Sequence, residues 1–151
     1  MSRTGVEAKP AWRSVPVSVR QEVGLTLGAE VTRAMRVYGG FSATPTFRLR
    51  LSDGRRAFFK AASAESTEFA HEAHTREERV YRELHPFIAK WSPALYGAFE
   101  IDGWRVMLLE DLGPKTAPPW KPAVLRAVTR AFGDFHCENQ GADFPDWLGR
   151  P

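Results

Sequence analysis

The stretch Thr46-Phe-Arg-Leu-Arg-Leu-Ser-Asp-Gly-Arg-Arg-Ala-Phe-Phe-Lys-Ala61 decides the fold. Its first six residues alternate polar and apolar side chains, which predicts a strand with one buried face. Ser52-Asp53-Gly54 is typical of a tight turn between antiparallel strands. Arg56–Ala61 is then predicted as the partner strand. The stretch therefore predicts a β-hairpin, around which the other elements are arranged.

Lys60 lies near the end of the second strand of this hairpin. Side chains two residues apart on a strand share a face, so Lys60 shares the face of Phe58. If Phe58 faces the core, the Lys60 ammonium is buried there and needs a negatively charged partner. If Phe59 faces the core instead, Lys60 faces water. The sequence leaves both alternatives open.

A helix is predicted over Ser66–Leu84, capped by Ser66 or Thr67 and ended by His85-Pro86. Its predicted apolar face is formed by Phe69, Ala70, Ala73, Val80, Tyr81 and Leu84.

Glu77 is the candidate partner of Lys60. It precedes Tyr81 by four residues, which places it on the sheet-facing side of the helix. Glu72 and Glu78 are expected further round the helix, where they are more easily solvated. The alternative is that all three carboxylates coat a solvated helix surface.

Three further strands are predicted, over Val31–Tyr38, Leu95–Ile101 and Trp104–Leu109, and a helix is predicted from Pro16 to Gly28. Five strands and one packed helix, with the helix inserted after the third strand, indicate an α+β fold. We therefore expect a five-stranded antiparallel sheet with a helix on one face.

The chain divides into four predicted segments. Residues 1–15 lack periodicity and are expected to form a flexible leader, followed by a lobe at 16–110. Glycine and prolines between Gly113 and Pro119 predict a hinge or linker at 111–121. Pro122–His136 is predicted as an amphipathic helix, the first of an incomplete helical lobe at 122–151.

Composition excludes several classes of protein. Of the 151 residues, 43% are hydrophobic and 26% charged, which is typical of a globular chain rather than a disordered one. No apolar run approaches the roughly 20 residues that span a bilayer, and the start does not resemble a signal peptide, so we expect a cytoplasmic protein without membrane contact. A net charge of +3 is too small to indicate nucleic acid. The single cysteine, Cys137, excludes an internal disulfide framework.

Two segments have the composition of a nucleotide site. Gly39-Gly-Phe-Ser-Ala-Thr44 lies between two predicted strands, where free amides and hydroxyls can donate to a phosphate. The alternative is an ordinary hairpin turn. Val106-Met-Leu-Leu-Glu-Asp-Leu-Gly113 runs from an apolar strand into the linker, where backbone groups can meet an adenine ring. The alternative is a core strand followed by a loop.

The order of these features resembles that of protein-kinase-like folds, and in detail that of the aminoglycoside phosphotransferases, a group of small-molecule kinases. The likeness covers about residues 18–148. It is carried by Gly39–Ser42, Leu49–Lys60, His74–Val80, Leu108–Leu112, and Ala131-Phe-Gly-Asp-Phe-His136, which is similar to the end of the first large-lobe helix of that family.

The resemblance implies roles for eight residues. Gly40, Phe41 and Ser42 would cover the nucleotide phosphates, although the full G-x-G-x-x-G loop of protein kinases is absent. Lys60 would bind the α- and β-phosphates and be held by Glu77. The adenine ring would meet the side chain of Leu109, the backbone carbonyl of Glu110 and the backbone amide of Leu112.

The resemblance also implies transfer of the γ-phosphate of ATP to a hydroxyl of a small molecule, with magnesium. In that family the catalytic aspartate and the metal-binding acid lie well beyond the first large-lobe helix. No residue of this chain matches them, so we assign no catalytic and no metal-binding residue. We expect the chain alone to bind nucleotide weakly and to be inactive.

Gly133-Asp-Phe-His-Cys-Glu-Asn139 imitates the catalytic loop of that family. We interpret it as helix instead, because position 132 is Phe rather than His and the pattern continues the helix from Pro122.

The sequence is also compatible with two functions other than phosphotransfer. A binding or regulatory module would recruit a partner or a second copy through Trp120, Phe132, Phe135 and Trp147. Nucleic-acid binding through Arg48, Arg50, Arg55 and Arg56 is the weaker alternative. The preferred partners are a nucleotide and a small-molecule acceptor, not nucleic acid.

Overall fold

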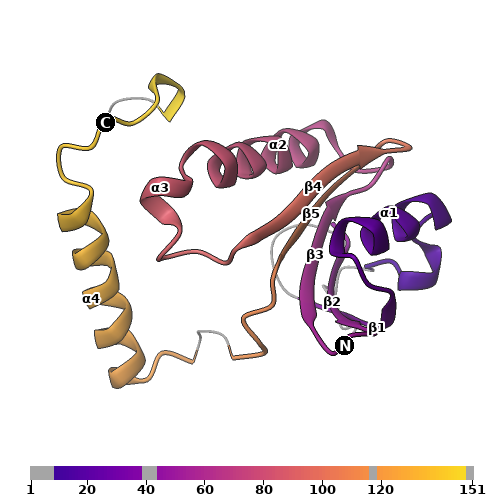
Figure 1. Ribbon diagram of the computed structural model, residues 1–151. Helices are drawn as coiled ribbons and strands as arrows, with labels where there is room; N and C mark the ends of the chain where they lie inside the picture. Colours follow the sequence, from indigo (N-terminus) through magenta and orange to yellow (C-terminus); the bar gives the residue numbers. More distant parts are fainter. Residues whose placement is uncertain (1–8, 39–43, 116–118, 149–151) are drawn as a thin grey trace, which may run out of the picture.

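The structure is a computed structural model and describes residues 9–38, 44–115 and 119–148 (Figure 1). A sheet of five strands lies between helices, and a long helix follows it at the C-terminal side. The elements in chain order are η1 Trp12–Ser14, α1 Val17–Leu27, β1 Val31–Arg36, β2 Thr46–Leu51, β3 Arg56–Ala62, α2 Glu68–Glu83, α3 His85–Ile88, β4 Leu95–Ile101, β5 Trp104–Glu110, α4 Pro122–Glu138 and η2 Asp146–Leu148.

The sheet has the strand order β1-β2-β3-β5-β4, and every neighbouring pair is antiparallel. The predicted five-stranded antiparallel sheet is confirmed, and so are both predicted hairpins. In the second hairpin Asp102 and Gly103 both have positive φ, as a tight turn between antiparallel strands requires. β3 lies at the centre of the sheet, which places its side chains under both layers of helix.

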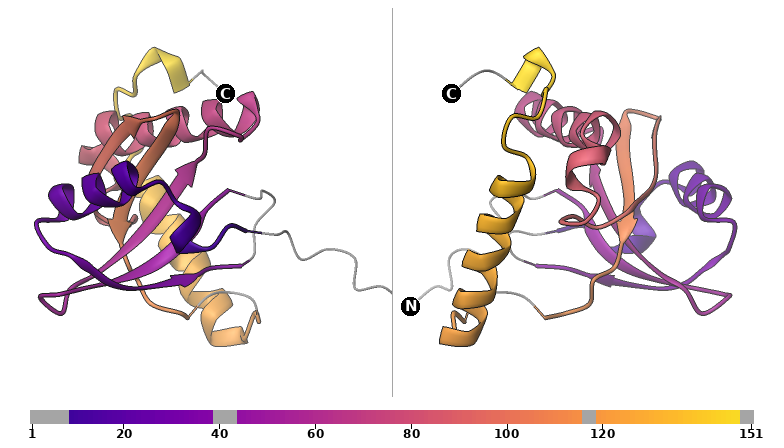
Figure 2. Two further views of the ribbon diagram at one scale, coloured as in Figure 1. Left: turned by 90° about the vertical axis from the view of Figure 1, so that its right-hand side faces the viewer. Right: turned by 60° about the vertical axis from the view of Figure 1, so that its left-hand side comes forward.

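One face of the sheet carries the apolar core. Phe47, Phe59 and Val106 are fully buried there against Val19 and Val23 of α1. Helix α1 packs on this face and ends at Gly28, whose left-handed conformation closes the helix. The sequence predicts this helix, but it predicts only one packed helix in the lobe, whereas α1 and α2 both cover the sheet, on opposite faces (Figures 1 and 2).

Residues 9–15 also belong to this core, although they were expected to be part of a flexible leader. Val15 is buried, and the Trp12 ring meets Phe47 and Phe59 edge-on at centroid distances of 5.2 and 5.3 Å. The Lys9 ammonium donates a hydrogen bond to the Thr46 hydroxyl. The segment has no periodicity because it is too short to form more than one 3₁₀ turn. The rest of the expected leader, residues 1–8, lies outside the described residues.

The opposite face of the sheet lies under α2. Phe59 points into the α1 core, and Phe58 and Lys60 therefore share the face toward α2. The sequence offered a buried Lys60 or a Lys60 that faces water. Because helices cover both faces of β3, Phe59 faces the core and Lys60 is half-buried under α2.

Helix α2 starts where predicted, with the Thr67 hydroxyl accepting a hydrogen bond from the Ala70 amide. The prediction for Phe69 is wrong, because its side chain is 78% exposed. The buried side of α2 includes His74, and five residues of helix place Phe69 about 140° away from it. The helix ends before His85, and the short helix α3 follows at once, with Pro86 in its first turn.

The amphipathic helix α4 contains no buried residue. Near its C-terminal end α4 contacts the segment after α2, where the rings of Trp91 and Phe135 lie 6.1 Å apart. Beyond the helix, the rings of Phe87 and Phe144 lie 4.8 Å apart. Figure 2 shows α4 standing beside the sheet lobe. Among the described residues, no helix is both long and apolar enough to cross a bilayer.

Phe59→Ala tests the placement of the core. Removing a fully buried phenylalanine should cost about 3–5 kcal/mol of unfolding free energy, whereas Phe69→Ala should change it by less than about 0.5 kcal/mol. Urea unfolding followed by circular dichroism measures both. If Phe59→Ala does not fold, Phe59→Leu gives a smaller, measurable loss. Equal effects at positions 59 and 69 would contradict this core.

Candidate functional site

Lys60 and Glu77 form an ion pair between β3 and α2. The Lys60 ammonium donates a hydrogen bond to Oε2 of Glu77, so the predicted pairing of these two residues is confirmed. Their side chains are 30% and 32% exposed. A pair this open contributes about 0–1 kcal/mol to stability. Its main consequence is therefore geometric, because it fixes a cation at one point of an accessible face.

Two apolar side chains lie on the same face as Lys60. Phe58 is two residues before it, and Leu109 of β5 is opposite Phe58 in the strand register. Leu109 is buried, and Met107, opposite Lys60, is fully buried. We call Phe58 and Leu109 the apolar floor; Phe58 is half-buried and Leu109 buried, and both lie on the face of the charged pair.

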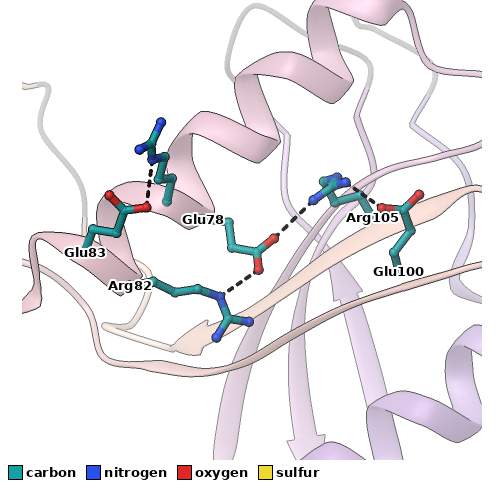
Figure 3. Close-up of polar contacts among 6 residues, drawn as sticks. Glu78, Arg82, Glu83, Glu100 and Arg105 are labelled. Carbon is teal, nitrogen blue, oxygen red and sulfur yellow. Dashed lines mark hydrogen bonds and ion pairs between the residues drawn. The ribbon is translucent and has the colours of Figure 1, made fainter. Parts of the chain in front are cut away.

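A second polar contact holds the next position of α2 against β5. Figure 3 shows Glu78 between Arg105 and Arg82, with Arg105 also reaching Glu100. The Glu78 carboxylate lies 3.4 Å from Arg105 and 2.8 Å from Arg82. The expectation that Glu78 is more easily solvated than Glu77 is wrong: its side chain is 18% exposed against 32% for Glu77, because Arg105 on the sheet attracts its carboxylate. Two consecutive glutamates thus fasten α2 to two strands.

His74 lies one turn before Glu77 on the buried side of α2 and is only 3% exposed. Neither of its ring nitrogens has a hydrogen-bond partner among the described residues. Burial, with the positive charge of Lys60 adding to it, lowers the pKa of His74 from 6.5 to about 4. His74 is therefore neutral at pH 7. No role was predicted for His74 from the sequence, although its spacing of three residues from Glu77 places both side chains on one face of the helix.

The linker that follows β5 is tied to the sheet by Arg48 of β2. The Arg48 guanidinium lies 3.7 Å from the Asp111 carboxylate and donates a hydrogen bond to the Gly113 carbonyl. The Glu110 amide donates to the carbonyl of Ala94. Leu112 is 68% exposed, and its backbone amide has no acceptor within the described part of the chain. This amide, three residues after Leu109 in the chain, is therefore an available donor in the linker.

The remaining site predictions have different outcomes. Gly40, Phe41 and Ser42 lie outside the described residues. Asp134 lies inside α4, so the predicted helix is confirmed there. Asn139 ends this helix, and its side-chain amide donates to the Phe135 carbonyl. Over residues 9–38, 44–115 and 119–148, no three His, Cys, Asp or Glu side chains gather where a metal ion could be held.

A solved structure of another protein shares the fold of this chain. No protein-family model and no curated protein matches the sequence. A crystal structure of a Haemophilus somnus 129PT protein, provisionally named a fructosamine-3-kinase, aligns with 85% of this chain at a TM-score of 0.55 and 14% sequence identity. The chain has a protein-kinase-like fold. It spans 40% of the length of that protein.

In this kinase-like lobe, the Lys60–Glu77 pair joins the central strand to the helix packed on it. Leu109 and Leu112 lie at the end of β5 and at the start of the linker. The structure thus brings Lys60 and Glu77 together and places Leu109 on the same face of the sheet.

His74 gives a pH-dependent prediction. The unfolded chain binds a proton at His74 near pH 6.5 but the folded chain only near pH 4, so stability falls as the pH drops through this window. The loss approaches about 3 kcal/mol below pH 4. His74→Gln removes the imidazole, so the unfolding free energies at pH 7 and pH 4 should differ less in this variant than in the unmodified chain.

The matched control for His74 is His136→Gln, on the exposed side of α4. It should keep the pH dependence of the unmodified chain in urea unfolding. A His74→Gln profile parallel to that of the unmodified chain would show that His74 titrates normally in the folded state.

Proposed function

We propose that this chain is the nucleotide-binding lobe of an ATP-dependent phosphotransferase that acts on a hydroxyl of a small molecule. The observation that carries the proposal is the Lys60–Glu77 ion pair on the face of Phe58 and Leu109. The protein-kinase-like fold supports it. The neighbour has the name of a small-molecule kinase, which favours a small-molecule acceptor over a protein. Among small-molecule kinases, the sequence resemblance favours the group that is similar to the aminoglycoside phosphotransferases.

Lys60 would bind the α- and β-phosphates of the nucleotide. An ammonium is a compact point charge with three donors, which suits several phosphate oxygens at once. Glu77 occupies one of these donors and leaves the others free to meet a ligand. Because the pair is about one-third exposed, its ammonium can be reached without unfolding α2.

The adenine ring would lie on the apolar floor at Phe58 and Leu109. At the end of this floor the Leu112 amide would donate to the ring edge, and the Glu110 carbonyl would accept from it. Gly40, Phe41 and Ser42 would cover the phosphates. The role of Phe58 follows from its position opposite Leu109. The roles of the other residues follow from the resemblance.

We assign neither the metal nor the catalytic base to a described residue. In phosphotransferases, magnesium bridges the phosphate oxygens and neutralises their charge. Among the described residues, no three His, Cys, Asp or Glu side chains gather where a metal ion could be held. Asp134 lies within a helix rather than a catalytic loop. We therefore propose nucleotide binding, but no transfer step, for these residues.

Lys60→Met should reduce the affinity for ATP by at least about tenfold, because it removes a charge-assisted contact to phosphate. Its unfolding free energy should change by no more than about 1 kcal/mol. Isothermal titration calorimetry with ATP measures the affinity. Lys90→Met is the matched control, since Lys90 pairs with Glu138 at the other end of the molecule and is exposed. Unchanged ATP affinity in Lys60→Met would refute the role of Lys60.

The 151-residue chain alone should consume no ATP in the presence of magnesium and an aminoglycoside. A coupled assay for ADP measures this. Sustained turnover that Asp134→Asn abolishes would show that Asp134 acts as a catalytic residue, against the assignment made from its helical setting.

A binding module is the second candidate, and the exposed side of α4 favours it. Leu125 and Phe132 lie on this helix and Trp120 just before it, and all three are exposed. Phe135 and Trp147 contribute less, because Phe135 contacts Trp91 and Trp147 lies against Arg79. Self-association in size-exclusion chromatography without any ATP binding would favour the module over the kinase lobe.

A further inference from the structure

Three arginines stand side by side across the first three strands of the sheet. Arg33 of β1 is opposite Arg50 of β2, and Arg50 is opposite Arg56 of β3. All three are exposed. Neighbouring strands lie about 4.8 Å apart, and like charges placed directly opposite each other destabilise a sheet. The arginine row, as we call these three residues, is therefore under mutual repulsion.

No acidic group relieves this repulsion within the described residues. Three arginines on or next to other strand positions have carboxylate partners: Arg48 pairs with Asp111, Arg55 with Asp53, and Arg105 with Glu78 and Glu100. None of the three members of the arginine row has an ion pair or a side-chain hydrogen bond in the part of the chain that the structure describes. The row therefore has unused donors and an uncompensated positive charge.

A groove of about 520 Å³ adjoins the arginine row. Arg50 and Arg56 line it together with Arg48, and the linker side contributes Asp111 and Pro114. Asp111 is its only carboxylate among the described lining residues, and Arg48 already pairs with it. The groove therefore has a net positive lining.

The groove is separate from the Lys60–Glu77 pair. Arg56 precedes Lys60 by four residues on β3, and at about 3.3 Å per residue this is roughly 13 Å along the strand. A phosphate group bound by Arg56 is thus not the phosphate group that Lys60 would hold, and the groove itself reaches the linker at Asp111 and Pro114.

We infer that the arginine row and its groove bind a small ligand carrying several phosphate groups. A guanidinium presents a planar fork of donors that matches phosphate oxygens two at a time. A volume of about 520 Å³ lies in the range of small-molecule sites. A nucleic acid would need an extended basic face, whereas the net charge of the chain is only +3. The ligand also relieves the repulsion between the arginines.

Inorganic tripolyphosphate is the probe for this site. Calorimetric titration of the full chain at low salt should give saturable binding that weakens at about 0.15 M salt. In the double variant Arg50→Gln/Arg56→Gln the affinity should fall by about tenfold per arginine, hence about a hundredfold. Arg126→Gln/Arg130→Gln is the matched control, since it removes two exposed charges from α4 and should stay within about threefold.

Lys60→Met separates this site from the proposed nucleotide site. Tripolyphosphate affinity should survive in Lys60→Met, even if ATP binding is lost. The inference is overturned if the unmodified chain does not bind tripolyphosphate, if Lys60→Met alone abolishes binding, or if the double variant and its control lose affinity equally. Tighter binding of citrate, or of a single-stranded oligonucleotide, through the same arginines would overturn the assignment of a small phosphate ligand.

The repulsion itself gives a second readout. Arg50→Gln removes the middle charge of the row, so at low salt it should raise the urea midpoint of the free chain, and this gain should shrink as salt is added. Arg126→Gln should show neither effect. A loss of stability in Arg50→Gln at low salt would contradict the strained row on which the inference rests.

Discussion

Successive side chains of β3 point to opposite faces of the sheet, and the rest of the structure depends on this alternation. Phe59 faces the core under α1, where it packs with Phe47 and with the Trp12 ring. Phe58 and Lys60 therefore face α2. A shift of one residue in the register of β3 would exchange these faces, placing an ammonium in the apolar core. The burial of Phe59 thus determines where the charge of Lys60 lies.

Helix α2 meets this face through ion pairs and through a small buried surface, in which His74 is buried and Tyr81 half-buried. Glu77 meets Lys60 of β3, and Glu78 meets Arg105 of β5, so two adjacent residues of one helix contact two adjacent strands. Between helix and sheet, His74 is buried without a hydrogen-bond partner among the described residues. A buried, unsatisfied group costs stability, so this contact is not built for maximum stability. An accessible ion pair on such a helix is suited to meeting a charged ligand.

The sequence predicts much of this lobe because its signals are local. Strict alternation and the turns at Asp53-Gly54 and Asp102-Gly103 are enough for both hairpins, and helix spacing is enough to make Glu77 the candidate partner of Lys60. Two tertiary contacts could not be predicted from the sequence. Trp12 packs into the core from a segment without periodicity. Phe69 points to solvent because His74 and Tyr81 define the buried side of α2. The arginine row could not be seen either, because strand register brings Arg33, Arg50 and Arg56 together. The roles of Gly40, Phe41 and Ser42 remain predictions.

The central claim is that Lys60 and Glu77 act as one unit in holding a nucleotide. A double-mutant cycle on ATP affinity, with Lys60→Met, Glu77→Gln and the double variant, tests it most directly. The account predicts that Glu77→Gln weakens binding when Lys60 is present and has no further effect once Lys60 is replaced. Independent, additive losses, or an ATP affinity insensitive to both changes, would contradict it.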